Sequence, residues 1–285
     1  MKETYQFSEG RLTIQDPDLG IDIDASFKPL RVPKDFSEIS HLVLKKDGQG
    51  GVLRAYFEIE GHFEGQYLLY YPGGGIETEC FYLNGELHGP SRFYSENGVC
   101  LSETWFYQDK KEGKSTRYYL SGKLSIIERY KKGILHGKQE YYYENGTLKS
   151  EMTYSRGMLE GSVELYWPNG QKKREVIFQT GLREGVDRMW NQQGVLLDEG
   201  KYRSGNPVGL HRRFFANGSP LEERHYYSPN RFDQKQWDES GDLLLEGKYD
   251  PSLQYVERSW KEGEETAKVG KWDGNRIQWR SDGPN

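Results

Sequence analysis

The chain has 285 residues, a formal net charge of −5, and a composition that is 34% hydrophobic and 14% aromatic. The low hydrophobic content, which includes 21 tyrosines, fits a thin layer better than a thick two-sheet core, and the aromatic content is too high for a disordered chain. The acidic balance argues against a surface for nucleic acid or anionic membranes, because such surfaces need a clustered excess of Lys and Arg.

The N-terminal segment, residues 1–60, lacks the regular pattern of the residues that follow it. It holds only a degenerate half-repeat, which begins near Leu53. Three prolines (Pro17, Pro29 and Pro33) and the acidic stretch Asp16–Asp24 indicate a short irregular or small β region. We expect this segment to cap the rest of the chain.

No targeting or membrane segment is visible in the sequence. The first ten residues are polar and lack the apolar core of a signal peptide. The longest apolar run, Tyr67–Tyr71, is far too short to span a bilayer. We therefore expect a cytoplasmic protein without stable membrane insertion, and delivery by a secretion route that needs no signal peptide stays open.

From residue 61 to residue 249, glycine recurs with a period of 24 residues. With Gly65 as position 1, the first column is Gly65, Gly89, Gly113, Gly137, Gly161, Gly185 and Gly209. The second column, at position 10, is Gly74, Gly98, Gly122, Gly146, Gly170, Gly194 and Gly218. The third column, at position 21, is Gly61, Gly85, Gly133, Gly157, Gly181 and Gly205, with Asp109 in the vacant place. A fixed period of roughly 20–50 residues marks a repeat array.

Two of these columns predict the turns of a hairpin. Position 10 is often preceded by asparagine, and Asn-Gly is the preferred dipeptide of a type I′ turn because both residues accept positive φ. The third column marks the return turn, where Asp109 is among the few residues that can replace glycine in the left-handed region.

Aromatic residues occupy two further columns between the turns. Position 6 is Tyr70, Tyr94, Tyr118, Tyr142, Tyr166, Trp190 and Phe214, and position 18 is Tyr82, Phe106, Tyr130, Tyr154, Phe178, Tyr202 and Tyr226. Such residues favour strands, and no segment shows a sustained period of 3.6 residues. The sequence predicts an all-β fold, an elongated single-sheet array of about eight stacked antiparallel β-hairpins with irregular capping ends.

The predicted domains follow this pattern: residues 1–60 form the N-terminal cap, 61–249 the repeat array and 250–285 the C-terminal capping strands. An eighth copy with one residue deleted continues the columns through Trp237, Gly241, Glu246 and Tyr249. In the last segment, Trp260, Trp272 and Trp279 indicate strands that cover the edge of the final hairpin.

Catalytic and metal-binding patterns are missing from the sequence. It has no Gly-x-Ser-x-Gly elbow, no complete P-loop and no His-Glu-x-x-His motif. Position 15 carries a column of glutamates, which we expect to pair with nearby Lys or Arg rather than to share a metal ion. Cys80 and Cys100 match no metal or redox spacing. We therefore expect no enzyme, no cofactor and no metal.

The repeats resemble the MORN-repeat superfamily. The segments that carry the resemblance are Glu140–Glu151, with its Tyr, Asn-Gly, Leu and Glu, and Leu135–Gly137, with its His-Gly. They are most similar to the bacterial YwqK-type variant, a family proposed to act as antitoxins. The resemblance implies stacked β-hairpins and a scaffold that binds other proteins. His-Gly is kept only at His88-Gly89 and His136-Gly137.

Position 7 offers the predicted binding residues. The column reads Tyr71, Ser95, Tyr119, Tyr143, Trp167, Asn191 and Phe215. Because adjacent strand positions point to opposite faces, we expect its five aromatics to project away from the position-6 ladder, where a partner can bury them. The interpretation is a monomeric, non-enzymatic protein-binding scaffold, of which a YwqK-type antitoxin that occludes its partner is one form. The alternative is a repeat protein that binds carbohydrate or a lipid surface.

Overall fold

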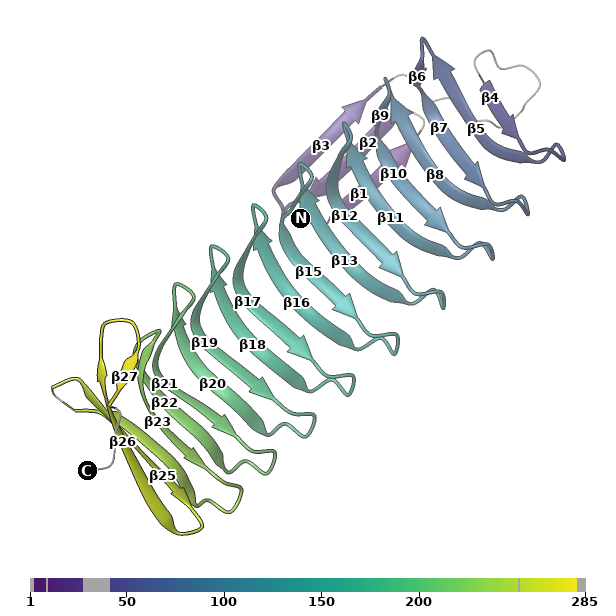
Figure 1. Ribbon diagram of the computed structural model, residues 1–285. Helices are drawn as coiled ribbons and strands as arrows, with labels where there is room; N and C mark the ends of the chain where they lie inside the picture. The colour runs from purple at the N-terminus through teal and green to yellow at the C-terminus, as the bar shows by residue number, and fades with distance from the viewer. Residues whose placement is uncertain (1–2, 9, 28–41, 251, 281–285) are drawn as a thin grey trace. The chain divides into compact units, whose positions relative to one another are not determined.

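The computed structural model describes residues 3–8, 10–27, 42–250 and 252–280, which fall into two compact units, Met1–Met158 and Leu159–Asn285. Pro29, Pro33 and the last five residues of the predicted ends lie outside the described residues. Every paired strand of the described chain is antiparallel, and no described residue is helical (Figure 1). The predicted all-β array of hairpin-linked strands in an open sheet is confirmed. Within these residues, no helix is long and apolar enough to cross a membrane.

The first unit contains a small sheet and the first part of the array. Its strands are β1 (Thr4–Ser8), β2 (Arg11–Asp16), β3 (Ile21–Ser26), β4 (Leu42–Lys46), β5 (Val52–Ile59), β6 (His62–Phe63), β7 (Gly65–Tyr70), β8 (Ile76–Leu83), β9 (Glu86–Leu87), β10 (Gly89–Tyr94), β11 (Cys100–Tyr107), β12 (Lys110–Tyr118), β13 (Leu124–Lys131), β14 (Ile134–Leu135), β15 (Gly137–Tyr142) and β16 (Leu148–Ser155). β1, β2 and β3 form a separate three-stranded sheet. The other strands pair with their neighbours in chain order, and the two-residue strands β6, β9 and β14 pair antiparallel with the ends of β5, β8 and β13.

The second unit continues the same hairpin pattern in chain order. Its strands are β17 (Met158–Tyr166), β18 (Lys172–Gln179), β19 (Leu182–Trp190), β20 (Leu196–Arg203), β21 (Asn206–Phe214), β22 (Pro220–Ser228), β23 (Arg231–Trp237), β24 (Leu243–Tyr249), β25 (Gln254–Lys261), β26 (Glu264–Trp272) and β27 (Ile277–Trp279). The three C-terminal tryptophans lie on β25, β26 and β27, and the predicted domain boundaries at residues 60 and 249 stay a prediction.

The two turns of each hairpin differ from the predicted assignment. At the Asn-Gly turn, Gly98 N–H donates to the Ser95 carbonyl at 2.8 Å, and Ser95 N–H donates to the Val99 carbonyl at 2.9 Å. Gly98 has a φ of 76°, whereas Asn97 is not in the left-handed region. The predicted type I′ turn is therefore wrong here, since this geometry is a type I turn closed by a glycine bulge.

The type I′ geometry occurs at the return turn instead. Asn84 and Gly85 have φ values of 52° and 82°, and Arg156 and Gly157 have 51° and 80°. A left-handed arginine costs free energy, so neighbouring repeats have to hold it in place. Gly157 N–H donates to the Leu135 carbonyl at 2.9 Å, which ties each return turn to the preceding one.

This turn geometry gives a prediction that separates the two residues of the Asn-Gly pair. Gly98→Ala should lower stability by about 1–2 kcal/mol, because alanine is strained at positive φ while its Cβ meets nothing within 4 Å. Asn97→Ala should cost about 0.5 kcal/mol or less. Urea unfolding of both variants measures the difference, and equal costs would restore the type I′ assignment.

The described hydrophobic core lies between the three-stranded sheet and the array of the first unit. Leu12, Ile14, Leu19, Ile21 and Trp105 are buried together, with partly buried aromatics around them. Full burial of one such aliphatic side chain stabilises the fold by about 1.5–3 kcal/mol. The N-terminal residues thus contribute most of this core, and the expected small β region is confirmed as a sheet that lies on a face of the array (Figure 1).

Candidate binding face

The predicted position-7 aromatics begin the turns that end at the second glycine column, just after the strands end. Tyr71 Oη donates to the Tyr94 carbonyl at 2.8 Å, and Tyr119 Oη donates to the Tyr142 carbonyl at 2.7 Å. In the second unit, the Trp167 Nε1–H donates to the Trp190 carbonyl at 3.1 Å. Each of these rings therefore bridges to the strand end 23 residues later.

All five position-7 aromatics are half-buried. Cations lie over two of them, Lys149 Nζ at 5.6 Å from the Tyr143 ring centre and Lys173 Nζ at 4.4 Å from that of Trp167. Phe215 opens its turn, with its N–H on the Ser219 carbonyl. Because these residues stand in turns, strand alternation does not set their direction, and that part of the reasoning is wrong. Their role in binding stays a prediction.

One face of the array carries positions 2, 4, 15 and 17, and we call it the repeat face. The strand register pairs position 2 with position 17, as in Pro90 opposite Trp105, and position 4 with position 15, as in Arg92 opposite Glu103. Cross-strand partners share a face, and alternate residues along one strand do so too. The repeat face therefore consists of two adjacent rows that run across the strands, one of positions 2 and 17 and one of positions 4 and 15.

The glutamate column pairs with cations, as predicted. In the first unit, Arg92 lies between Glu103, with Nε–Oε2 at 2.6 Å, and Glu79, with Nη1–Oε2 at 3.2 Å. In the second unit, the register aligns charges of alternating sign across seven consecutive strands: Arg188, Glu199, Arg212, Glu223, Lys235, Glu246 and Arg258. We call this row the charge ladder.

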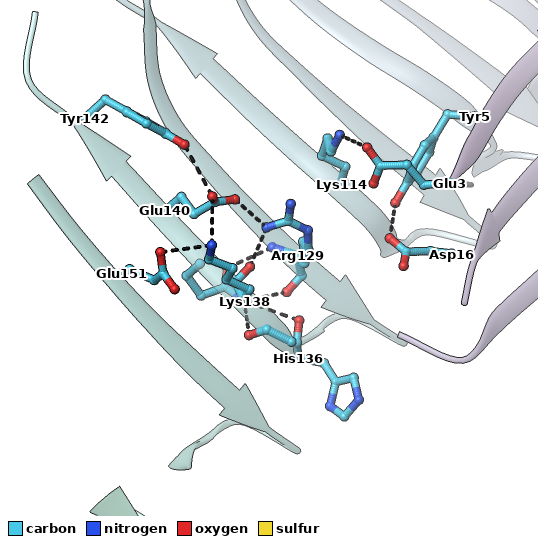
Figure 2. Close-up of polar contacts among 12 residues, drawn as sticks. Glu3, Tyr5, Asp16, Lys114, Arg129, His136, Lys138, Glu140, Tyr142 and Glu151 are labelled. Carbon is cyan, nitrogen blue, oxygen red and sulfur yellow. Dashed lines mark hydrogen bonds and ion pairs between the residues drawn. The ribbon is translucent and has the colours of Figure 1, made fainter. Parts of the chain in front are cut away.

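A connected cluster of charges lies on β13, β15 and β16 (Figure 2). Arg129 Nη1 donates to Glu140 at 3.0 Å, and Lys138 Nζ contacts both Glu140 at 3.3 Å and Glu151 at 2.9 Å. Burial alone would raise the pKa of Glu140, but the hydrogen bond and charge of Arg129, together with Lys138, hold that pKa below its usual value. The ionised Glu140 therefore stabilises the folded chain.

The lowered pKa of Glu140 predicts a pH dependence. Since its folded pKa is lower than its unfolded value of 4.5, its contribution is complete above that value and is lost as pH falls through the folded pKa. Glu140→Gln should therefore have a lower urea midpoint than wild type at pH 7, and this difference should shrink below about pH 4.5. A difference that grows on acidification would contradict this assignment.

In the first unit, the three-stranded sheet already occupies part of the repeat face. The Tyr5 and Trp105 ring centres are 5.5 Å apart, and those of Phe7 and Phe81 are 4.6 Å apart. Two polar contacts join its edges to the array: Lys114 Nζ to Glu3, visible in Figure 2, and Lys131 Nζ to the Leu19 carbonyl at 2.8 Å. Within the sheet, Tyr5 Oη donates to Asp16, also visible in Figure 2. The repeat face thus accommodates a packed β-sheet.

Glycine makes this close approach possible. A Cβ added at Gly113 would lie 2.5 Å from a ring carbon of Tyr5, and at Gly89 it would lie 2.5 Å from a ring carbon of Phe7. At Gly137 it would overlap with a methyl group of Leu19. Beside this contact, a cavity of about 700 Å³ lies between β1 and the array, lined by Phe7, Phe81 and Trp105 among others.

The second unit carries the same repeat face without a covering sheet among the described residues. A Cβ at Gly161 or Gly209 would meet nothing within 4 Å. Two aliphatic residues of this face are open to solvent, with Ile177 40% and Leu210 46% exposed. A hollow of about 300 Å³ lies between β19, β20 and β21, with Val186 and Leu210 in its lining and Arg188, Lys201 and Arg212 beside Glu199.

Residues 111–132, 135–156 and 159–179 match the family described as MORN repeat variant. This chain carries MORN-variant repeats. No curated protein matches the chain. The predicted MORN resemblance is confirmed for these three segments, which span β12–β13, β14–β16 and β17–β18. MORN repeats point to a non-catalytic repeat protein, and no enzyme family is found.

The described residues offer no cluster of three or more His, Cys, Asp or Glu that could hold a metal ion. Both cysteines are free thiols, Cys80 buried and Cys100 half-buried. Burial raises the pKa of Cys80 to about 11, so the reactive thiolate is scarce at neutral pH. Burial also raises the pKa of the Cys100 thiol, so neither cysteine has the features of a nucleophile.

Position 24, directly before the first glycine column, was not recognised from the sequence as a bonding position. Its side chain accepts from the backbone N–H of the next return turn: Glu112 from Lys132 at 2.6 Å, Glu160 from Thr180 at 2.8 Å and Glu184 from Ser204 at 2.8 Å. His136 does the same through Nδ1, which accepts from Arg156 N–H at 3.3 Å. The shared ability to accept explains how His136 can take the place of Glu at this position.

Proposed function

We propose that this chain is a non-enzymatic scaffold that binds another protein through its repeat face. The observation that supports this most directly is that the same face already holds a β-sheet in the first unit, through aromatic contacts and glycine. Such a face can bury apolar side chains without a pre-formed cleft. A repeat array also offers the same local geometry several times, which suits an extended protein surface.

The finer proposal is a monomeric cytoplasmic protein of the YwqK type, which binds a toxic partner and occludes its active surface. The resemblance of the repeats supports it, together with the clustered aromatics at position 7. Tyr71, Tyr119, Tyr143, Trp167 and Phe215, which lie at the turns and not on the repeat face, remain proposed contact residues for a second contact area of the same partner. Their bridging hydrogen bonds mean that a partner would meet rings that are already held in place.

The test is affinity capture by the purified chain from an extract of its source cells, with and without Tyr143→Ala/Trp167→Ala. A partner that is recovered in stoichiometric amount, and that then binds as a purified protein, supports the scaffold. If the double variant stays folded and keeps the partner at unchanged affinity, the position-7 residues are not the contact. If no protein binds the wild type with saturation, the scaffold proposal falls.

A further inference from the structure

The repeat face of the second unit pairs apolar and charged residues at fixed places. Its outer row, positions 2 and 17, pairs Ser162 with Ile177, Val186 with Lys201, and Leu210 with His225. In the first unit, the same two positions hold Pro90 opposite Trp105, the pair that packs under the three-stranded sheet. The second unit therefore presents aliphatic side chains where the first unit buries its contact with β1–β3.

The charges around these aliphatic residues are not balanced locally. Arg188 and Arg212 share a single carboxylate, Glu199, whose distance to Arg188 Nε is 3.4 Å. Lys201 lines the same hollow, so three cations surround one carboxylate. The next glutamates of the ladder, Glu175 and Glu223, lie opposite Arg188 and Arg212, and Glu175 is engaged with Lys172 at 3.4 Å. Within the lining of the hollow, three cations thus face one carboxylate, on a chain whose net charge is −5.

The hollow also continues along the face. A second, smaller hollow of about 100 Å³ shares Leu210 and is lined by His225, Asp233 and Lys235 among others. The two together cross the strands from β19 to β24. An occupant that follows this line needs small or aliphatic side chains over Val186 and Leu210, and carboxylates beside Arg188, Lys201 and Arg212.

We propose that this face of the second unit binds an extended β segment of a protein partner whose array-facing side chains, at every second residue, are alternately apolar and acidic. The apolar side chains pack on Ile177, Val186 and Leu210, and the acidic ones pair with Arg188, Lys201 and Arg212. Two observations carry the choice of partner, namely the charge excess of the hollow and the β-sheet that covers the same repeat positions in the first unit. The inference rests on the proposed scaffold function and names the chemistry of its partner.

The probe is a pair of synthetic twelve-residue peptides, titrated into the full chain. In one, Leu and Glu alternate at every second residue, in the other Leu and Lys do so, and Thr fills the positions between, so that both kinds of side chain lie on one face of the extended peptide. We expect the Leu–Glu peptide to bind with saturation, at least about tenfold more tightly than the Leu–Lys peptide, because complementary charge selects the partner. Hydrogen exchange of the complex should show added protection in β19–β21. Absence of saturable binding, or protection elsewhere, would overturn the proposal.

Variants then locate the site. Arg188→Gln/Arg212→Gln and, separately, Leu210→Ser should each weaken binding of the Leu–Glu peptide about tenfold or more. Matched controls are Arg258→Gln, at the far end of the charge ladder, and Leu182→Ser, an exposed leucine outside the hollow. Both controls should bind as wild type does, and equal losses in test and control variants would contradict the assignment.

A second arm separates this inference from the scaffold function itself. The captured partner of the preceding test is titrated with wild type and with Leu210→Ser. If the complex persists at unchanged affinity, the scaffold stands and this face is wrong. Sedimentation of the chain alone tests the remaining possible occupant, which is a second copy of this chain. A dimer that Leu210→Ser abolishes would mean that this face binds a second copy and not a foreign partner.

Discussion

Gly113→Ala and Gly137→Ala should destabilise the first unit much more than Gly161→Ala and Gly209→Ala destabilise the second. All four glycines hold the same place in the repeat, with φ values of 74°, 74°, 80° and 65°. The strain of alanine at positive φ is therefore common to the four variants, at about 1–2 kcal/mol each. What differs is the space above them.

Above Gly113 lies the ring of Tyr5, and above Gly137 lies Leu19, whereas nothing lies within 4 Å of a Cβ at Gly161 or Gly209. Overpacking of this kind costs a further ~1–3 kcal/mol. The sheet β1–β3 can also respond by lifting from the array, since a three-stranded sheet of this size has little stability of its own. We therefore expect a lower urea midpoint together with faster hydrogen exchange in β1–β3.

Hydrogen exchange resolved by segment is the suitable measurement, because a repeat array need not unfold in one step. In Gly161→Ala and Gly209→Ala, the exchange of β1–β3 should match wild type. If all four variants lose the same stability and leave β1–β3 unchanged, the sheet does not rest on the glycines as described.

The hairpin array itself was predictable, because a local signal repeats seven times. Each copy needs a turn at the same two places, and glycine with its few substitutes records those places in the sequence. The turn types were not predictable from the same signal. Asparagine tolerates positive φ but is not obliged to adopt it, so the Asn97-Gly98 pair reads equally well as either turn.

At the return turn, the residue that adopts positive φ is often of a type that does not favour this conformation. Arg156 and Lys132 occupy this place, with φ values of 51° and 53°. Contacts between repeats fix them there: Arg156 N–H donates to His136 Nδ1, and Lys132 N–H donates to Glu112. Bonds that join residues 20 positions apart override local preference, and no window of a few residues contains both partners.

The position of the N-terminal sheet shows a similar limit. Alternation of apolar residues, as in Leu12 and Ile14 or Ile21 and Ile23, is visible in the sequence and typical of strands with one buried face. The residues that cover that face lie more than 60 positions further along the chain, as in the contact of Tyr5 with Trp105, so the local pattern does not show them. For the same reason, the sequence pattern pointed to the position-7 aromatics as the binding surface. It did not show that the repeat face is covered in the first unit and open in the second.

Arg174→Met should be among the most damaging side-chain truncations in the second unit. Asp187 is 4% exposed and accepts two hydrogen bonds from Arg174, Nε to Oδ1 at 2.9 Å and Nη2 to Oδ2 at 2.6 Å. Arg183 adds only a longer contact, with Nη1 at 3.4 Å from Oδ2. Removing one partner of a buried pair leaves a carboxylate without its solvation, at a cost of about 2–4 kcal/mol.

The matched control is Arg258→Met, whose partner Glu265 is about half exposed, so its loss should cost about 0.5 kcal/mol or less. Urea unfolding of both variants measures the contrast. A cost for Arg174→Met no larger than that of Arg258→Met would mean that the buried carboxylate is solvated in another way.

Replacing both members of the pair tests the explanation itself. Val163 occupies the repeat position of Asp187 and is 8% exposed, so an aliphatic residue fits this place in a neighbouring copy. Asp187→Val/Arg174→Met should therefore recover most of the stability that Arg174→Met alone removes, since no buried charge remains unpaired. A double variant that is as unstable as the single one would show that packing of the Arg174 side chain, rather than its charge, stabilises this part of the sheet.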